Sequence, residues 1–302
     1  MAAILGVRFH MQWLASLSSR VIDVWANLPL GTAEKTSLKA FLTGLLLFLI
    51  VYAVERIYRV RDNDFRSRGF VHDIVYWFYY RTNLNYFLYT TVLLAALEEP
   101  LSFLDLKLVS SLPAALQAVL IFLVGDFVGY WAHRAQHSFK FLWAFHTTHH
   151  SQEQVNIFTG ARFHPIDALW LLLFAYLPLR IMGGSSQIWP WLAFLIWIVN
   201  MLIHSRIPWG YGPLHKLLVS PNFHAYHHST DPAHFNKNFS TGTFCVWDYM
   251  FGTAVKDREP IPTLFGLTNV KPTSLWSTLV TPFRLLGEFY LTPVSGKISD
   301  SR

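Results

Sequence analysis

The sequence predicts an all-α membrane protein built as a four- or five-span helical bundle. Hydrophobic residues make up 53% of the chain and charged residues only 14%, against about a quarter charged in typical soluble domains. Apolar runs without charged residues recur along the chain, as they do in proteins that cross a bilayer several times. Eight histidines also gather in three clusters between residues 133 and 228. The bundle is therefore expected to carry a histidine-rich site.

The predicted spans follow from the uncharged runs, which cover residues 40–54, 82–97, 108–125 and 168–203. The last run is interrupted only by Arg180 and by a Gly-Gly-Ser-Ser turn at residues 183–186, so we interpret it as a hairpin of two spans. Each run is somewhat short of the roughly 20 residues that cross a bilayer upright. Some helices therefore need flanking residues, local thinning or only partial penetration, and the span count is four or five.

The histidine clusters have the spacing of helical metal ligands. Residues three or four apart lie on one face of a helix, so each cluster can aim two or three imidazoles at a common point. One metal rarely needs more than four nitrogen ligands, so eight imidazoles indicate two ions, and imidazole suits iron, zinc, copper or nickel. The clustered histidines are His133, His137, His146, His149, His150, His224, His227 and His228.

Cysteine and charge limit the other possibilities. The single cysteine, Cys245, allows no internal disulfide and excludes a site of several thiolates, so nitrogen and oxygen ligands are expected. The net charge of +6 does not indicate a nucleic-acid partner, because many of the basic residues lie in the segment 56–68 directly after the first span. Anchoring at the membrane interface explains them better. Residues 1–17 lack the cleavage site of a removed signal peptide.

The predicted topology brings the clusters to one side of the membrane. If the basic segment 56–68 is cytoplasmic, the second span leads out to the turn at residues 98–100 and the third returns with His133 at its inner end. The hairpin then goes out and comes back, with Asn200 and His204 at its inner end. We therefore expect an integral, multi-pass membrane protein with a cytoplasmic histidine-rich cap that holds a dimetal site.

Four further residues could support the metals. Asp126 lies on the same predicted helical stripe as His133, so it could orient a ligand, or it could be a buried aspartate bonded to a neighbouring hydroxyl. His204, four residues after Asn200, is favoured as a further ligand over an interfacial residue, because its side of the membrane matches. For His164, a role beside the site and a structural role both stay open.

The motifs then resemble a known family. The sequences HRAQH, HTTHH and HAYHH, with YW just before the first and WDYMFGT after the last, resemble the fatty acid hydroxylase and sterol desaturase superfamily of integral-membrane di-iron oxygenases. The matching motifs span residues 126–253. This resemblance divides the chain into an N-terminal segment (1–38), a membrane di-iron oxygenase domain (39–256) and a C-terminal tail (257–302).

The resemblance implies two irons and the residues that hold them. The eight clustered histidines carry over as ligands, together with His204, whereas Asn200 matches a position that is histidine in some relatives and asparagine in others. A water-mediated contact is expected for Asn200. The resemblance also implies O₂ as co-substrate and a lipid substrate from the bilayer, such as a fatty acyl chain or a sterol. Because no haem or flavin module is visible, electrons are expected from a separate donor, such as a cytochrome b5-like protein, a ferredoxin or a reductase.

The expected reaction is hydroxylation of a lipid C–H bond. The three residues between His133 and His137 resemble the hydroxylase and sterol-modifying branches more than the acyl-CoA desaturases, so a sterol-type desaturase of the same superfamily stays open. In a different class, a membrane metal-binding or electron-transfer protein would place histidines inside its spans, whereas here they lie at the span ends and beyond. A metalloprotease would need H-E-x-x-H, and HRAQH lacks the glutamate.

Overall fold

The regular structure of this chain is helical. The computed structural model describes residues 32–58, 66–81, 100–183, 189–255, 261–268, 270–271 and 273–291, and no β-strand occurs among them. The all-α prediction is therefore confirmed for this part of the chain. The α-helices are α2 (Thr32–Ile57), α3 (Arg68–Arg81), α6 (Ala114–Ser138), α7 (Lys140–His150), α8 (Pro165–Met182), α9 (Trp189–Ile203), α10 (Pro221–His227), α11 (Val246–Met250) and α12 (Leu275–Leu291). Four 3₁₀ turns occur in the described ranges: η2 (Ser102–Leu104), η3 (Thr159–Ala161), η4 (Gly212–Leu214) and η5 (Pro232–His234).

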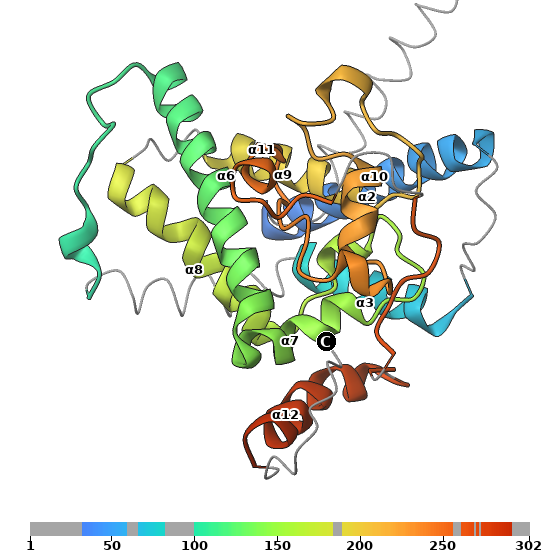
Figure 1. The fold of residues 1–302 in the computed structure, drawn as a ribbon. Coiled ribbons are helices and arrows are strands. Elements are labelled where there is room, and N and C mark those ends of the chain that lie inside the picture. Colours follow the sequence, from blue (N-terminus) through green and yellow to red (C-terminus); the bar gives the residue numbers. More distant parts are fainter. Residues whose placement is uncertain are drawn as a thin grey trace, which may run out of the picture.

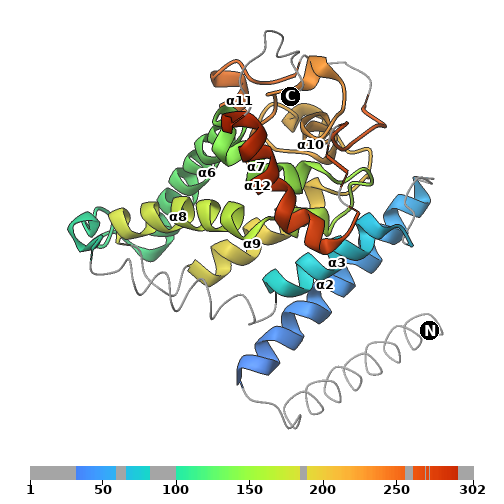
Figure 2. The same ribbon diagram turned by 90° about the horizontal axis from the view of Figure 1, so that it is seen from below.

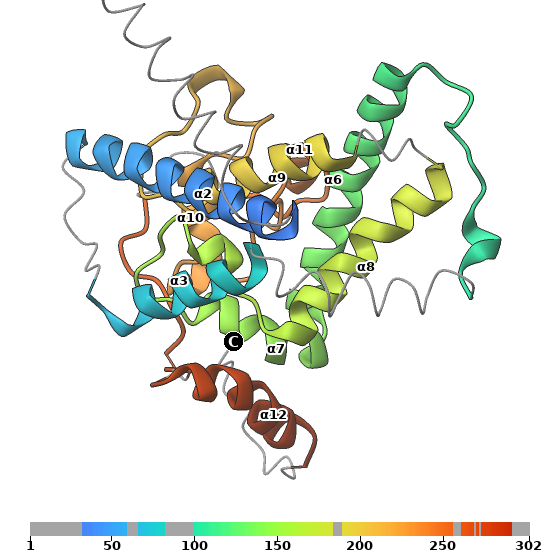
Figure 3. The same cartoon turned by 180° about the vertical axis from the view of Figure 1, so that it is seen from behind.

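Two groups of helices flank the centre of the molecule. Helices α6 and α8 pack side by side on one flank, and α2 and α3 lie together on the other (Figure 1; Figure 3). Helix α7 lies between the C-terminal end of α6 and the short helix α10 (Figure 2). The three histidine clusters fall on α6, α7 and α10, so this arrangement brings them to one place.

Two of the described helices, α6 and α8, are long and apolar enough to cross a membrane. Helix α2 covers the first predicted span, and α9 holds a shorter apolar stretch, Phe194–Ile203. The predicted span at residues 82–97 lies outside the described residues. The count of four or five spans therefore stays a prediction.

The helix ends differ from the apolar runs for local reasons. The run predicted from residue 108 becomes helical only at Ala114, because Pro113 is the N-cap and disfavours helical geometry at the residue before it. Of the turn predicted at residues 183–186, only Gly183 lies in the described residues, and it ends α8 in the left-handed region with a φ of 64°. Glycine adopts that conformation without the steric cost that a Cβ imposes.

An aromatic core joins α2 and α3 to the segment that follows α7. Trp77 of α3 packs against Phe158 with ring centroids 5.1 Å apart, and Phe48 of α2 packs on the same Phe158 ring at 5.1 Å. Gly44 lets α2 approach this core, because a Cβ there would overlap the Trp77 indole. Burial of large aromatic side chains is the main stabilising term for such a contact.

A buried ion pair fixes α3 against the same segment. Asp73 and Arg162 meet at 2.7 Å, with side chains 0% and 2% exposed. The other Asp73 oxygen accepts from Gln152, Asn156 and Thr159 at 2.6, 2.8 and 2.8 Å. These hydrogen bonds help to offset the free-energy cost of removing the carboxylate from water. An ion pair alone often does not offset that cost.

The ion pair is also connected to α7, the helix that carries three of the clustered histidines. The Nε of Arg162 donates to the carbonyl of Thr148 in α7 at 2.9 Å. Thr148 in turn donates its hydroxyl to the carbonyl of Thr278 in α12 at 3.2 Å. Helix α12 therefore packs on the outer side of α7 (Figure 3), although it lies in the segment that the sequence sets apart as a C-terminal tail.

Candidate metal centre

Nine histidines converge at the meeting point of the helices. Two come from α6, three from α7, one from the end of α9, and three from α10 and its C-cap. They form two groups, and within each group the candidate ligand atoms lie within 4.8 Å of one another. The first group is His133, His137, His146, His150 and His227, and the second is His149, His204, His224 and His228. We call all nine the histidine centre.

The membership matches the sequence-based ligand set residue for residue. Every histidine predicted as a ligand lies in one of the two groups, and each group is large enough to hold one ion. Their role as ligands stays a prediction. The structure shows that the spacing of the clusters and the packing of the helices together place the imidazoles within reach of two ions.

The centre is closed to solvent. Eight of the nine residues are at most 6% exposed, and the His137 ring is buried with them. Several rings face each other through the same nitrogen, with Nε2 to Nε2 distances of 3.0 Å for His133 and His146 and 3.0 Å for His204 and His224. Nitrogens at this spacing repel unless a proton or a cation lies between them.

The opposite ring nitrogens show which way the imidazoles point. In four of the nine, Nδ1 lies within hydrogen-bond distance of an oxygen that can only accept, so Nδ1 carries the hydrogen and Nε2 offers its lone pair inward. Three partners are backbone carbonyls and one is a carboxylate. The pairs are His133 with Phe239 O at 2.6 Å, His204 with Asn200 O at 2.6 Å, His227 with Lys237 O at 2.8 Å and His146 with Asp167 Oδ2 at 3.0 Å.

Several of the remaining ring nitrogens are buried without a hydrogen-bond partner among the described residues. The Nε2 atoms of His137, His150 and His227 are buried and have no hydrogen-bond partner among the described residues. A buried polar atom without a partner is costly, and a metal ion would satisfy all three together. The donor set therefore fits metal binding in the first group, with two further Nε2 atoms from His133 and His146 beside them.

Burial also sets the protonation state of the centre. It lowers the pKa of His227 to about 3 and the pKa of His204 to about 4, with the carbonyl on each Nδ1 acting in the opposite direction. Burial and the neighbouring imidazoles lower the pKa of His150 and His228 well below the ordinary value. These four rings are therefore neutral near pH 7, which is the form that binds metals.

Asp167 is the carboxylate that orients a histidine of the centre. It lies in the first turn of α8 and is 2% exposed. One oxygen accepts from His146 and the other from the Gln136 amide. Asp167 was not predicted as a site residue from the sequence, although it stands three residues after His164.

Replacing Asp167 with asparagine should lower metal affinity by about 10–100-fold, the range typical of lost partners of metal-bound histidines. The amide can present N–H instead of an acceptor to His146, so the Nε2 lone pair is no longer aimed inward. Metal retention during titration with a chelator measures the effect. Asp105→Asn, an exposed change outside the centre, serves as the control. Equal retention by Asp167→Asn and wild type would remove Asp167 from this role.

A second aspartate holds the loop whose carbonyl accepts a hydrogen bond from His133. Asp248 of α11 is fully buried and accepts from the backbone N–H groups of Phe239 and Ser240 at 2.8 and 2.9 Å. This fixes the peptide whose Phe239 carbonyl accepts from His133. Thr253 also donates to Asp248, at 2.6 Å. The segment 239–253 therefore holds the first group from outside.

Two residues considered beside the metals have other contacts. Asp126 accepts from the N–H of Thr243 at 2.6 Å and from the indole of Trp247 at 2.7 Å, and the structure records no bond to an imidazole. His164 is the N-cap of α8 and accepts from Ile166, while its Nε2 donates to the Leu279 carbonyl at 3.2 Å. Both residues fix segments of the fold in this structure.

Asn200 lies next to the centre. Its backbone carbonyl accepts from His204, and its side-chain Oδ1 is buried without a hydrogen-bond partner among the described residues. Gly160 makes room for it, because a Cβ at that position would overlap Oδ1. The water-mediated contact expected for Asn200 stays a prediction.

The part of the chain that carries the histidine groups also matches a known family model. Residues 118–253 match the family model described as fatty acid hydroxylase. This part of the chain is therefore similar to the fatty acid hydroxylase family, as the motifs predicted. The match ends at Thr253, the last residue of the WDYMFGT motif.

Three relatives show the range of named activities. An ornithine lipid hydroxylase of Rhizobium tropici is 30% identical over 175 residues, which are 58% of this chain and 53% of the relative. An alkylglycerol monooxygenase of Xenopus tropicalis is 35% identical over 150 residues, 50% of this chain and 32% of that protein. A very-long-chain aldehyde decarbonylase of Oryza sativa subsp. japonica is 27% identical over 221 residues, 70% of this chain and 80% of that protein.

The chain spans about half the length of the first of these relatives and about a third of the second. The similarity thus covers the domain that carries the histidines rather than whole proteins. No solved structure shows a significant match to this chain.

Proposed function

We propose that this protein is a membrane-bound di-iron monooxygenase that uses O₂ and external electrons to hydroxylate a C–H bond of a lipid. The observation that carries the proposal is the histidine centre: nine buried imidazoles in two groups, with Nε2 atoms turned inward. The relatives named as a lipid hydroxylase and as monooxygenases support the reaction class.

The two groups would hold one iron each. His133, His137, His146, His150 and His227 would hold the first, and His149, His204, His224 and His228 the second. Two irons, when bound, supply the electrons and the oxidising power that O₂ activation requires. Asn200 would reach the second iron through a water.

The protein's own contribution is orientation and exclusion of water. The carbonyls of Phe239, Lys237 and Asn200 hold three Nδ1 hydrogens, and Asp167 holds a fourth, so four imidazoles are fixed before any metal arrives. Preorganised ligands bind without the cost of ordering them. The buried setting also protects a reactive oxidant from side reactions with solvent.

The same proposal includes the location of the protein and its orientation in the membrane. We place the protein in a membrane as an integral, multi-pass protein with the histidine centre on the cytoplasmic face. Helices α6 and α8 support the spans, and the basic segment 56–68 supports the orientation. The substrate would enter from the bilayer, and electrons would come from a separate donor protein.

Turnover of a lipid extract under ¹⁸O₂ tests the reaction. Hydroxylation predicts a product heavier by one ¹⁸O atom, because the inserted oxygen derives from O₂ and not from water. The same extract with H₂¹⁸O and ordinary O₂ is the control and should give no label. An unlabelled alkene as the only product would show the sterol-type desaturase reaction instead, and a metal-dependent redox change without lipid turnover would show an electron-transfer protein.

A further inference from the structure

A cavity of about 400 Å³ lies beside the second histidine group. It is bounded by the residues at and after the inner end of α9 (203–208), by the start of α10 (221–225) and by the segment 261–265. His224, a member of the histidine centre, forms part of its wall. The cavity therefore reaches from the molecular surface to the edge of the candidate metal site.

Most of the wall is apolar. Val155, Ile203, Ile207 and Phe265 are all buried residues that line it. Exposed residues stand at its outer side, among them Thr263. Cavities with apolar walls and few polar groups are typical of sites for small apolar or amphiphilic ligands.

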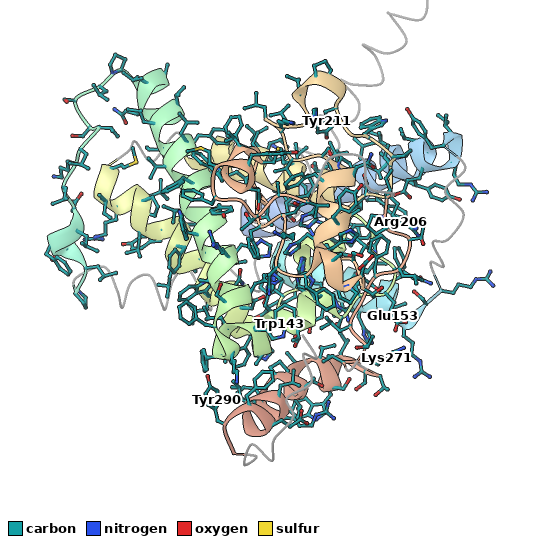
Figure 4. The ribbon with its side chains drawn as sticks, viewed as in Figure 1. Trp143, Glu153, Arg206, Tyr211, Lys271 and Tyr290 are labelled. Carbon is teal, nitrogen blue, oxygen red and sulfur yellow. The ribbon has the colours of Figure 1, made fainter. Side chains whose placement is uncertain are left out.

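One charged side chain lines this wall. The Arg206 guanidinium lies over the Phe265 ring, 5.4 Å from its centroid, and Figure 4 labels Arg206 beside α10. Glu55 of α2 accepts the backbone N–H of Arg206 at 2.8 Å, but Glu55 does not line the cavity. A guanidinium has five N–H donors in a fixed fork, so it can serve an oxyanion in addition to its other contacts.

Two buried polar atoms lie on residues of the same wall. The Ser205 hydroxyl and the His224 Nδ1 have no hydrogen-bond partner among the described residues. The His224 Nε2 faces His204 and His228 at 3.0 and 3.1 Å, so Nδ1 carries the hydrogen on the opposite side of the ring. Both atoms belong to residues that line the cavity, and each has a hydrogen that it can donate.

The cavity is also close to the expected membrane boundary. Its α9 wall continues from the apolar stretch Phe194–Ile203. Next to it, the Trp209 indole donates to the Tyr58 hydroxyl at the end of α2, at 3.1 Å. Trp and Tyr are enriched at the level of lipid headgroups.

We infer that this cavity binds the head of an anionic lipid, with a carboxylate or phosphate group on Arg206 and Ser205 and the chain along the apolar wall beside His224. The inference rests on the proposed function in one respect: the bound lipid is taken to be the substrate of the histidine centre. It assigns Arg206 as the residue that selects oxyanion-headed lipids.

Photolabelling of the full chain in phosphatidylcholine nanodiscs tests this assignment. The probes are a fatty acid with a diazirine in its chain and the fatty alcohol of the same chain. The acid should label residues 203–208, 221–225 and 261–265 about tenfold more than the alcohol, the ratio expected for one charge-assisted hydrogen bond. Arg206→Gln should reduce acid labelling to the alcohol level, and Arg206→Lys should keep part of it.

Control variants separate labelling that depends on the cavity from labelling that does not. Arg284→Gln removes an exposed arginine of α12 and should leave labelling unchanged, whereas Thr263→Trp should lower labelling by both probes because it fills the outer side of the cavity. Equal labelling by acid and alcohol in wild type overturns the inference without any variant. Displacement of the acid by inorganic phosphate as effective as by an alkyl phosphate would show a free-anion site and overturn the lipid assignment. Because no turnover is needed, each of these failures leaves the ¹⁸O₂ result unaffected.

Discussion

Replacing His227 with alanine is expected to reduce lipid turnover by more than about 1,000-fold while the protein still inserts and folds. The estimate follows because loss of a residue that only orients a ligand typically costs 10–100-fold, and loss of the ligand itself costs more. His227 is buried, its Nδ1 is held by Lys237 O, and its Nε2 has no partner among the described residues. His146→Ala should have the same effect.

A histidine outside the centre provides the matched control. His215 lies between α9 and α10 and bonds to the carbonyl of Gly212, so His215→Ala should keep turnover within about twofold, as surface substitutions usually do. Turnover per folded protein, measured by the labelled product and corrected for size-exclusion yield, gives the comparison. Wild-type activity in His227→Ala or in His146→Ala would exclude that residue from the ligand set.

Asp73→Ala should destabilise the protein by about 3–5 kcal/mol, because it leaves the Arg162 charge buried without its partner. That loss is a large share of the roughly 5–15 kcal/mol that stabilises a typical domain. Three further donors, from Gln152, Asn156 and Thr159, also lose their acceptor. Because Arg162 donates to Thr148 in α7, the histidine centre should loosen as the fold does.

An exposed ion pair gives the comparison for this change. Glu153 and Lys271 lie 3.1 Å apart with side chains 58% and 69% exposed (Figure 4), so Glu153→Ala should cost less than about 1 kcal/mol. The midpoint of thermal unfolding in nanodiscs should fall sharply for Asp73→Ala and hardly at all for Glu153→Ala. Similar midpoints for the two variants would show that the buried pair does not stabilise the fold.

The grouping of the histidines could be predicted because it depends on local spacing along the chain. His133 and His137, four apart, share a face of one helix whatever the rest of the chain does. His204 was found in the same way, from its distance to Asn200 and from the side of the membrane on which its helix ends. These three histidines lie in the two groups of the histidine centre.

The supporting residues depend on packing between helices, which spacing does not reveal. Asp126 shares a stripe with His133, but a rise of about 1.5 Å per residue separates them by about 10 Å along α6, and Asp126 instead meets Trp247. Asp167 reaches His146 only because α8 packs beside α6 and α7. His164 turns to α12, a helix in a segment where the sequence offered no family resemblance to interpret.

The most direct measurement of the central claim is the metal content of the active protein. Two groups of histidines predict about two irons per chain, and loss of activity when a chelator removes them. His227→Ala, in the first group, and His224→Ala, in the second, should each reduce the iron content while the chain remains folded. Elemental analysis that finds two irons in wild type and fewer in both variants would support the account. One iron or none in active protein would contradict it.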